Sequence, residues 1–213
     1  MKKLLLSQLA TVGLLVSSAS AANLLVNPSF ESGTLTGWNV NGGAIGQPGI
    51  GAQSGAFSTL LTTPGNGVPE INQSFAATPG QEFNFSGYMM TPAALPGGPS
   101  FGLLKIVFRD AGNVDLQVTQ AAIGTIVGPS FPGVETSQVN SSSAINTWFF
   151  LEAQATAPAT TTSVLFLALD IEFNGGNHPV YVDNLQASVV PEPSSATIAL
   201  LGGLSFFARR RKQ

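Results

Sequence analysis

Clusters of glycine and proline interrupt the middle of this 213-residue chain at intervals that favour short segments over long helices. The chain contains 24 Gly and 14 Pro, the residue types that most often mark turns. The clusters lie at residues 42–51, 64–69, 92–100, 128–133 and 174–179. This spacing predicts many short strands joined by turns.

The segments between these clusters alternate apolar and polar residues with a period of two. Residues 82–88, 101–109 and 164–173 show this alternation, and Lys105 and Arg109 lie on the face opposite the even-numbered apolar residues of their segment. Shorter β-rich runs cover residues 148–151 and 180–182. Such alternation is typical of strands, and no window of a dozen residues outside the two termini has the helical period. The sequence therefore predicts an all-β body, an antiparallel β-sandwich.

A secretory signal peptide is predicted at residues 1–21. Two lysines form its basic start, an apolar stretch ends at Val16, and small residues lead to a cleavage site after Ala21. The alternative, a membrane-spanning anchor, is weaker because the apolar run is well short of the roughly 20 residues that a span needs. Cleavage leaves residues 22–190 as one β-sandwich domain.

The C-terminal segment, residues 191–213, has three parts in a fixed order. A Pro-Glu-Pro triplet comes first, an uncharged apolar stretch runs from Ala196 to Ala208, and a basic cluster follows. An apolar helix followed at once by cations is a stop-transfer signal whose basic end stays in the cytoplasm. Together with the export signal, it places the body outside the inner membrane. The triplet and the basic cluster consist of Pro191, Glu192, Pro193, Arg209, Arg210, Arg211 and Lys212.

This arrangement resembles the PEP-CTERM sorting signal of Gram-negative bacteria. The resemblance implies recognition by an exosortase, an integral-membrane enzyme that would cleave near the triplet and release or transfer the body. The protein would contact the inner membrane transiently and end on the outer surface or in the extracellular matrix. Proteins with this signal accompany exopolysaccharide and biofilm systems. The alternative is an ordinary tail anchor that is never cut.

The charge of the body limits its partners. Lys105 and Arg109 are its only cations against ten carboxylates, so residues 22–190 carry a net charge of −8. A body of this charge repels nucleic acid. The chain has no Cys, which excludes a disulfide scaffold, Cys-ligated metals and a Cys nucleophile.

Three short segments near the two ends of the body carry a second resemblance. They are residues 23–33 with the turn Asn-Pro-Ser-Phe-Glu, the Gly-Trp pair that ends at Trp38, and residues 180–185. Together they resemble the galactose-binding-domain-like jelly rolls, which include many carbohydrate-binding modules. The resemblance implies a single antiparallel jelly-roll β-sandwich.

The same resemblance implies a structural Ca²⁺ site at Glu31 and Asp183, where the first and last strands of such domains pair. Ca²⁺ takes about six to eight oxygen ligands from carboxylates and carbonyls, so the residue types suit the ion. In the alternative interpretation, Glu31 caps a turn and Asp183 is solvated at the end of a strand.

No residue pattern marks a catalytic centre. His178, the one histidine, lies in a polar turn where a solvated side chain is the usual state. No motif selects two of the ten carboxylates as a glycosidase pair. We therefore predict no catalytic residue.

Aromatic side chains are the first candidates for stacking on sugar rings. Trp38 and Trp148 are expected in the core, whereas Tyr88, Phe101, Phe131 and His178 are placed nearer to loops. The sequence predicts an exported protein that binds extracellular polysaccharide without catalysis. The alternatives are a purely structural envelope or biofilm protein without a small ligand, and a hydrolase.

Overall fold

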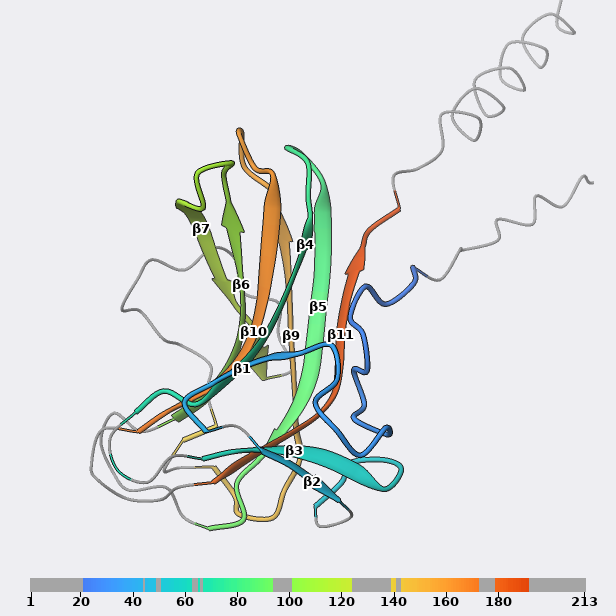
Figure 1. Cartoon of the computed structure of the whole chain (residues 1–213), viewed down its shortest axis with the longest axis vertical. Helices are drawn as coiled ribbons and strands as arrows, with labels where there is room; N and C mark the ends of the chain where they lie inside the picture. Colours follow the sequence, from blue (N-terminus) through green and yellow to red (C-terminus); the bar gives the residue numbers. More distant parts are fainter. Residues whose placement is uncertain are drawn as a thin grey trace, which may run out of the picture.

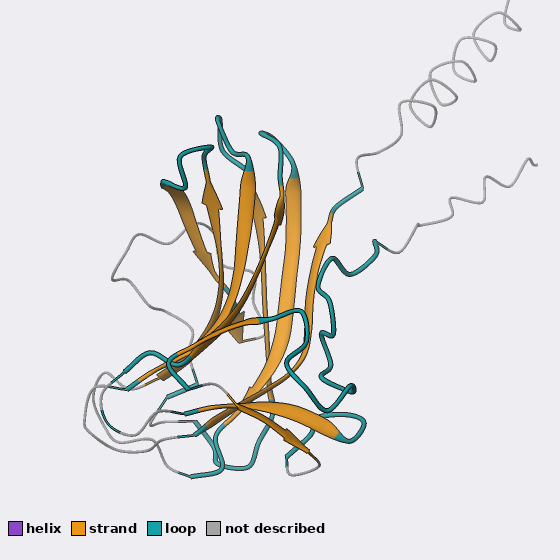
Figure 2. Ribbon diagram, viewed as in Figure 1, coloured by secondary structure: helices purple, strands orange, loops and turns teal. Residues whose placement is uncertain are grey.

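The computed structural model describes residues 21–43, 45–48, 51–62, 65, 67–93, 101–123, 139–140, 143–172 and 179–191. In these ranges the chain forms strands and loops and no helix (Figure 2). Two sheets pack face to face (Figure 1), and all their strand pairs are antiparallel. The predicted antiparallel β-sandwich is confirmed.

The two sheets have five and six strands. The order in the five-stranded sheet is β1 (Asn39–Asn41), β4 (Glu70–Ala76), β10 (Ser163–Ile171), β6 (Phe101–Arg109) and β7 (Asp115–Gln120). The order in the six-stranded sheet is β2 (Ile45–Pro48), β3 (Phe57–Leu61), β11 (Val180–Val189), β5 (Glu82–Met90), β9 (Phe149–Thr156) and β8 (Ala122–Ile123). Each predicted strand segment contains a strand: the segment at 164–173 is a strand up to Ile171, the segment at 148–151 starts its strand at Phe149, and the segment at 180–182 extends to Val189.

The core lies between the sheets and contains the alternate residues that the sequence pattern assigned to one face. On β10 these are Val164, Phe166 and Ala168, and on β5 they include Phe83 and Phe85. Burial of such side chains is the main driving force for packing one sheet on another. The fully buried aromatic side chains are Phe30, Phe83, Phe85, Phe108 and Phe166.

The two tryptophans differ in burial. Trp38 is buried, and its ring centroid lies 5.7 Å from that of Phe30 and 6.1 Å from that of Phe166, so the prediction of a core position is confirmed. Trp148 is only partly buried and is not part of the core cluster. Its predicted core position is wrong because the residue precedes β9 and is not aligned with the inward-facing residues of that strand.

The outer face of the five-stranded sheet carries a second apolar cluster. It is formed by odd-numbered residues of β6 and β10, with Val118 of β7 and Ile171 packed against it. The alternation of these strands therefore does not separate an apolar face from a polar one, because both faces are largely apolar. The cluster consists of Phe101, Leu103, Val107, Leu165, Leu167 and Leu169.

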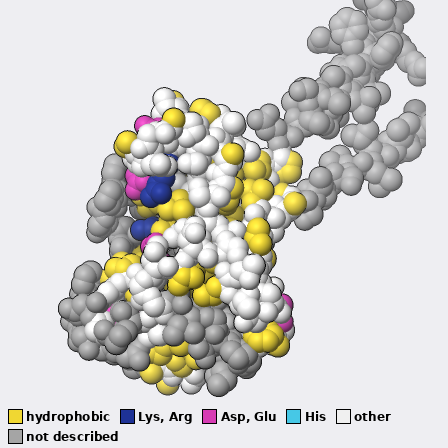
Figure 3. Space-filling view, in the orientation of Figure 1, with side chains coloured by type: hydrophobic (Ala, Val, Ile, Leu, Met, Phe, Trp, Pro, Cys, Tyr) yellow, Lys and Arg dark blue, Asp and Glu magenta, His cyan; other side chains and the backbone are white. Residues whose placement is uncertain are grey.

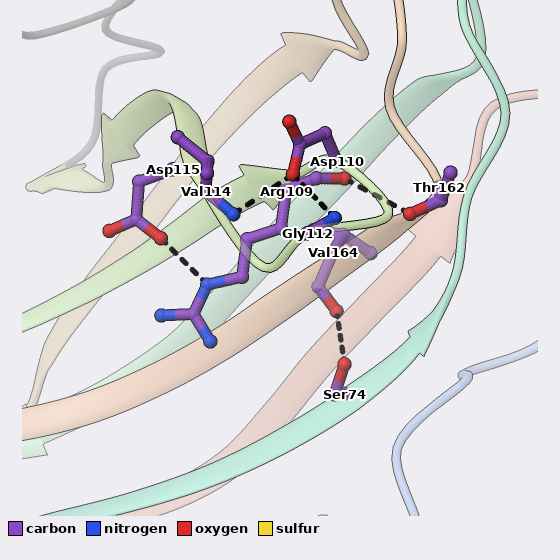
Figure 4. Close-up of polar contacts among 8 residues, drawn as sticks. All are labelled: Ser74, Arg109, Asp110, Gly112, Val114, Asp115, Thr162 and Val164. Atoms are coloured by element: carbon purple, nitrogen blue, oxygen red, sulfur yellow. Dashed lines mark hydrogen bonds and ion pairs between the residues drawn. The ribbon is translucent and has the colours of Figure 1, made fainter.

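An ion pair lies on the hairpin formed by β6 and β7 (Figure 4). Arg109 Nε donates to Asp115 Oδ1 at 2.7 Å, and Asp110 Oδ1 accepts the backbone N–H groups of Gly112 and Val114 at 2.8 and 3.0 Å. Lys105 also belongs to β6, so both described cations lie on the five-stranded sheet. Figure 3 shows Lys and Arg atoms beside Asp and Glu atoms on the visible face.

The start and the end of the described chain lie side by side. Residues 23–28 run along β11 (Figure 1), where Leu24 N donates to Ala187 O at 2.7 Å and Leu185 N donates to Pro28 O at 2.9 Å. At the other end, Val190 N donates to Glu82 O at 2.8 Å. The predicted signal peptide and the predicted sorting signal beyond Pro191 lie almost entirely outside the described residues. In the described ranges no helix has the length and hydropathy needed to span a membrane.

Candidate functional site

An open groove with a volume of about 270 Å³ lies on the outer face of the six-stranded sheet. It follows β5, which pairs with β9 on one side and β11 on the other. The odd-numbered residues of β5 fill the core, so its even-numbered residues Asn84 and Ser86 face outwards. The lining residues are Asn84, Phe85, Ser86, Phe150, Glu152, Ala153, Gln186 and Ser188.

The strand register places polar side chains in rows across the groove. Ser86 lies opposite Glu152 of β9 and opposite Gln186 of β11, and Asn84 lies opposite Ser188. A bulge in β11 between Asp183 and Gln186 shifts the register, and Asn184 within it has a left-handed φ of 48°. The bulge therefore decides which β11 side chains face β5 in the groove.

An aromatic pair lies at one end of these rows. Tyr88 and Phe150 are cross-strand neighbours whose ring centroids are 5.0 Å apart with an interplanar angle of 50°. Phe150 is 36% exposed, so part of its ring surface is accessible to a ligand beside polar side chains. The groove therefore offers an apolar ring surface next to hydroxyl, amide and carboxylate groups.

This combination suits a ligand with both apolar faces and many hydroxyl groups. Asn84 and Gln186 can each donate and accept hydrogen bonds, whereas Glu152 accepts them when ionised. Glu152 is the one charged side chain among the described lining residues, and no described cation lies on this sheet. A glycosidase site needs a second carboxylate, and the described lining does not supply one.

Glu31 and Asp183, the predicted calcium ligands, both contact the loop at residues 51–57 that leads into β3. Asp183 Oδ2 accepts the N–H groups of Gln53 and Ser54 at 2.7 and 3.2 Å. Glu31 Oε1 accepts the N–H groups of Ala56 and Phe57 at 3.1 and 3.0 Å. The two carboxylates therefore hold the same loop, an arrangement that we call the carboxylate clasp.

Asp183 is fully buried, so the alternative in which it is solvated at a strand end is wrong. Burial raises the pKa of Asp183, and the negative charge of Glu31 also raises it. The backbone N–H groups of Ser54, Asn184 and Gln53 lower the pKa, because they donate hydrogen bonds to the ionised carboxylate. Because Glu31 and Asp183 both accept hydrogen bonds from residues 53–57, the structure places the two carboxylates on the same loop. Glu31 itself is exposed and binds a turn, as the alternative interpretation expected.

Other residues complete the clasp. Asn184 Nδ2 donates to Ser54 Oγ at 2.8 Å and also contacts Gln53 Oε1. Gly55 has a φ of +71°, and a Cβ there would lie 2.4 Å from Glu31 Oε1. Both the backbone conformation and the position of the Glu31 carboxylate therefore favour glycine at this position.

The clasp fits Ca²⁺ by the chemistry of its donors. Glu31 Oε2 and Asp183 Oδ1 each accept one backbone N–H, which leaves each oxygen able to bind a cation. Gln53 and Ser54 add neutral oxygens beside them. No group of three or more His, Asp or Glu side chains lies together in the part of the chain that the structure describes. A hard cation that accepts neutral oxygens suits this donor set better than a metal that requires imidazole.

The remaining predicted residues have different outcomes. Phe101 is buried in the outer apolar cluster and forms no exposed platform. Pro191 is exposed, whereas Phe131, His178, Glu192, Pro193, Arg209, Arg210 and Arg211 lie outside the described residues.

The sequence analysis did not identify Phe150, Glu152 and Gln186 as site residues. The β-rich run at residues 148–151 places Phe150 on a strand, but all four residues are apolar, so the run does not show which face Phe150 occupies. No local pattern pairs Gln186 with Ser86.

Solved structures with a similar fold include carbohydrate-binding modules. TmCBM61, solved in complex with β-1,4-galactotriose, has a TM-score of 0.52 and 12% identity, over 80% of this chain and 100% of that chain. The CBM22-1 xylan-binding domain of Paenibacillus barcinonensis Xyn10C has a TM-score of 0.51 and 19% identity, over 82% of this chain and 99% of that chain. Almost the whole length of each of these two modules is matched by this chain, so the similarity extends over the two-sheet sandwich.

A larger protein is also similar. The enzymatically active domain of tailspike protein 4 from bacteriophage CBA120 has a TM-score of 0.53 and 13% identity, over 79% of this chain and 21% of that chain. This chain thus spans about a fifth of the tailspike structure. No protein family model and no curated protein sequence matches the chain. At these identities the likeness shows the fold, which is the β-sandwich found in carbohydrate-binding modules.

Proposed function

We propose that this protein is exported and binds an extracellular polysaccharide without catalysis, in the groove of the six-stranded sheet. The observation that carries the proposal is the exposed ring of Phe150, packed against half-buried Tyr88, beside a row of amide, hydroxyl and carboxylate groups. Carbohydrate-binding modules with the same fold support it, since their structures were solved as xylan- and galactotriose-binding proteins.

The groove suggests how a sugar chain would be held. The apolar face of a pyranose packs on the ring of Phe150, while Asn84 and Gln186 exchange hydrogen bonds with its hydroxyl groups. Glu152 favours neutral or positively charged sugars over acidic ones, because a uronate or sulfate would meet like charge. Lys105 and Arg109 lie on the other sheet and cannot compensate that repulsion.

A single site of this kind binds weakly. The groove is open, so a hydrated sugar keeps part of its water, and each hydrogen bond to protein replaces one to water at small net gain. Many copies on one surface would bind a long polysaccharide together, which raises the overall affinity without new contacts. This fits a role in adhesion to a matrix.

The test is titration calorimetry of the purified full chain with xylan, galactan, chitosan and an acidic polysaccharide. Phe150→Ala should weaken binding about tenfold, or about 1.4 kcal/mol, because the stacking surface is lost. Val114→Ala is the matched control, since Val114 is also an exposed apolar residue but lies in the β6–β7 turn of the other sheet. Absence of binding to every polysaccharide, by the free chain and by the chain immobilised at high density, would leave a purely structural envelope role.

Export and sorting form the second part of the proposal. The triplet Pro191-Glu192-Pro193 starts directly after Val190, whose N–H makes a backbone hydrogen bond to the sandwich, and Pro191 is exposed. A processing enzyme that reaches Pro191 would therefore meet an exposed residue directly after the last backbone hydrogen bond of the sandwich. We infer cleavage by an exosortase at the triplet, transient inner-membrane contact and a final location on the outer surface or in the matrix.

The third part of the proposal is a structural Ca²⁺ in the carboxylate clasp. Glu31 and Asp183 would supply the anionic ligands, and Gln53 and Ser54 neutral ones. Burial is the main cause of the raised pKa of Asp183 and the charge of Glu31 adds to it, and a bound cation would offset both. It would thereby fasten the loop at residues 51–57 to β11.

A further inference from the structure

Two acidic residues lie inside the sandwich where β10 ends. Val164, Phe166 and Ala168 of β10 face the core, and the same alternation of side chains continues to Asp170 and Glu172. Both acidic residues are fully buried. Residues two apart in extended chain point to the same face, about 6.6 Å from each other along it, so the two carboxyl groups are neighbours.

Backbone hydrogen bonds hold both acidic residues against the segment that leads into β4. Asp170 N donates to Pro69 O at 3.0 Å. Gly67 and Glu172 form a backbone bridge, in which the N–H of each residue donates to the C=O of the other at 2.8 Å. The pair therefore lies where β10 is joined to residues 67–69.

The core beside Asp170 is apolar. Gly102 of β6 lies opposite Asp170 in the strand register and has no side chain. Val180 of β11 and Met89 of β5 approach Gly102 from the other sheet, since a Cβ on this glycine would lie 2.9 and 3.1 Å from their side chains. No cation among these neighbours compensates a negative charge on Asp170.

The titratable side chains of the neighbouring strands lie elsewhere. Glu70 of β4 accepts hydrogen bonds from Asn41 and Asn72 at 2.9 and 3.1 Å, and Lys105 of β6 lies opposite Leu167 of the outer apolar cluster. The others lie on the outer face of their sheet or at the far end of their strand, and they are Glu82 and Tyr88 of β5, Arg109 of β6, and Tyr181 and Asp183 of β11. Among the described residues, Glu172 is the charged group that acts on Asp170.

Two ionised carboxylates would be unfavourable in these surroundings. A buried charge is costly, and a like charge beside it adds to the cost. Burial, the charge of Glu172 and a hydrogen bond with the Glu172 side chain together raise the pKa of Asp170 to about 9, although the N–H group of Ile171 opposes this. Asp183, in contrast, accepts three backbone N–H groups that favour its ionised form. Asp170 is therefore the buried aspartate that keeps its proton at neutral pH.

We propose that Asp170 and Glu172 share one proton and form a pH-sensitive contact that holds this end of the sandwich together. The protonated Asp170 carboxyl group donates a hydrogen bond to the Glu172 carboxylate, so the pair carries one negative charge instead of two. Loss of the proton places two negative charges side by side in the core, and the bridge between Gly67 and Glu172 should then open. The inference depends neither on the proposed polysaccharide binding nor on Ca²⁺ in the clasp.

Folding takes up this proton, which sets the direction of the pH dependence. The unfolded chain releases the proton near the ordinary aspartate pKa of about 4, whereas the native chain keeps it up to about pH 9. The stability that comes from the pair is complete below the first value and is lost as the pH rises towards the second. Between the two values, the unfolding constant should increase about tenfold per pH unit.

Urea unfolding of the full chain from pH 6 to pH 9, in the presence of a chelator, tests this dependence. Asp170→Asn keeps a hydrogen-bond donor towards Glu172 and has no proton to lose, so its unfolding constant should lack the tenfold increase per pH unit that the pair gives the wild type. Asp115→Asn is the matched control, because Asp115 is an exposed aspartate at the start of β7. This control should keep the pH dependence of the wild type.

Infrared spectroscopy detects the proton itself, because protonated and ionised carboxyl groups absorb at different frequencies. At pH 7 the wild type and Asp115→Asn should have a band of a protonated carboxyl group that Asp170→Asn lacks. If Asp170→Asn does not fold, Glu172→Gln replaces it, and the loss of the Glu172 charge should lower the pH at which this band disappears by about one unit. The proposal is overturned if Asp170→Asn has the spectrum and the pH dependence of the wild type. It is also overturned if the band of Glu172→Gln disappears at the same pH as that of the wild type.

Discussion

Glu31 and Asp183, from opposite ends of the body, hold one loop by its backbone N–H groups. Asp183 binds Gln53 and Ser54, and Glu31 binds Ala56 and Phe57. Hydrogen bonds to charged groups are stronger than neutral ones, at about 1.5–3 kcal/mol each. The clasp therefore connects the N-terminal turn, β3 and β11 even before any cation binds.

Gly55→Ala should destabilise the protein more than Gly80→Ala. Both glycines have a left-handed φ, +71° and +81°, so alanine strains the backbone by about 1–2 kcal/mol at either position. At Gly80 a Cβ meets nothing within 4 Å, whereas at Gly55 it would meet the Glu31 carboxylate. Displacement of Glu31 should add about 1–3 kcal/mol, measured as a lower urea midpoint.

A double-mutant cycle checks the cause of that difference. In a Glu31→Ala background, Gly55→Ala should cost no more than Gly80→Ala, because the displaced carboxylate is gone. An excess cost that persists without Glu31 would show that the loop backbone alone, and not the clasp, makes alanine unfavourable.

Removal of Ca²⁺ should lower the Tm of the full chain. An ion that binds only the native state stabilises it by about 2.7 kcal/mol at a hundredfold excess over Kd. Glu31→Gln should remove most of this response, because Glu31 supplies one of the two anionic ligands of the clasp. A Tm response in Glu31→Gln equal to that of the wild type would show that the clasp works by its N–H contacts alone.

Glu152→Gln should change the selectivity of the groove more than its overall affinity. Loss of the carboxylate should weaken binding of chitosan about fivefold, by about 1 kcal/mol, and should reduce the salt dependence of that binding. Binding of neutral xylan or galactan should change less. Glu82→Gln is the matched control, since Glu82 lies at the start of β5 and outside the groove lining. If Glu152→Gln weakens the binding of chitosan and of the neutral polysaccharides equally, Glu152 acts as a hydrogen-bond acceptor rather than as a charge.

Processing at the C-terminus should be visible in the mass of the native protein. If an exosortase reads the signal, mature protein should end near Pro191 and lack the cluster from Arg209 to Lys212. Intact-mass spectrometry of protein taken from the envelope measures this, and Glu192→Ala should leave the precursor in the inner membrane. A complete C-terminus in every molecule would instead identify a permanent tail anchor.

The strands that were easiest to predict are those in which every second side chain fills the core. Residues 101–109 form β6 as predicted, because their even-numbered side chains fill the core. The end of β11 was harder to predict, since Asn184 has a positive φ and a bulge interrupts the alternation after Asp183. The odd-numbered residues of β10 form an outer apolar cluster, which local periodicity could not reveal because both faces read as apolar.

The sequence by itself determined the all-β class and the antiparallel sandwich. These follow from the period of side chains along a strand and from short motifs, which are local properties. Only the tertiary structure decided that exposed Phe150 lies beside half-buried Tyr88, that Gln186 faces Ser86, and that Asp170 is fully buried. These depend on strand register and on packing between sheets, where residues distant in sequence meet and the surrounding atoms set burial and charge.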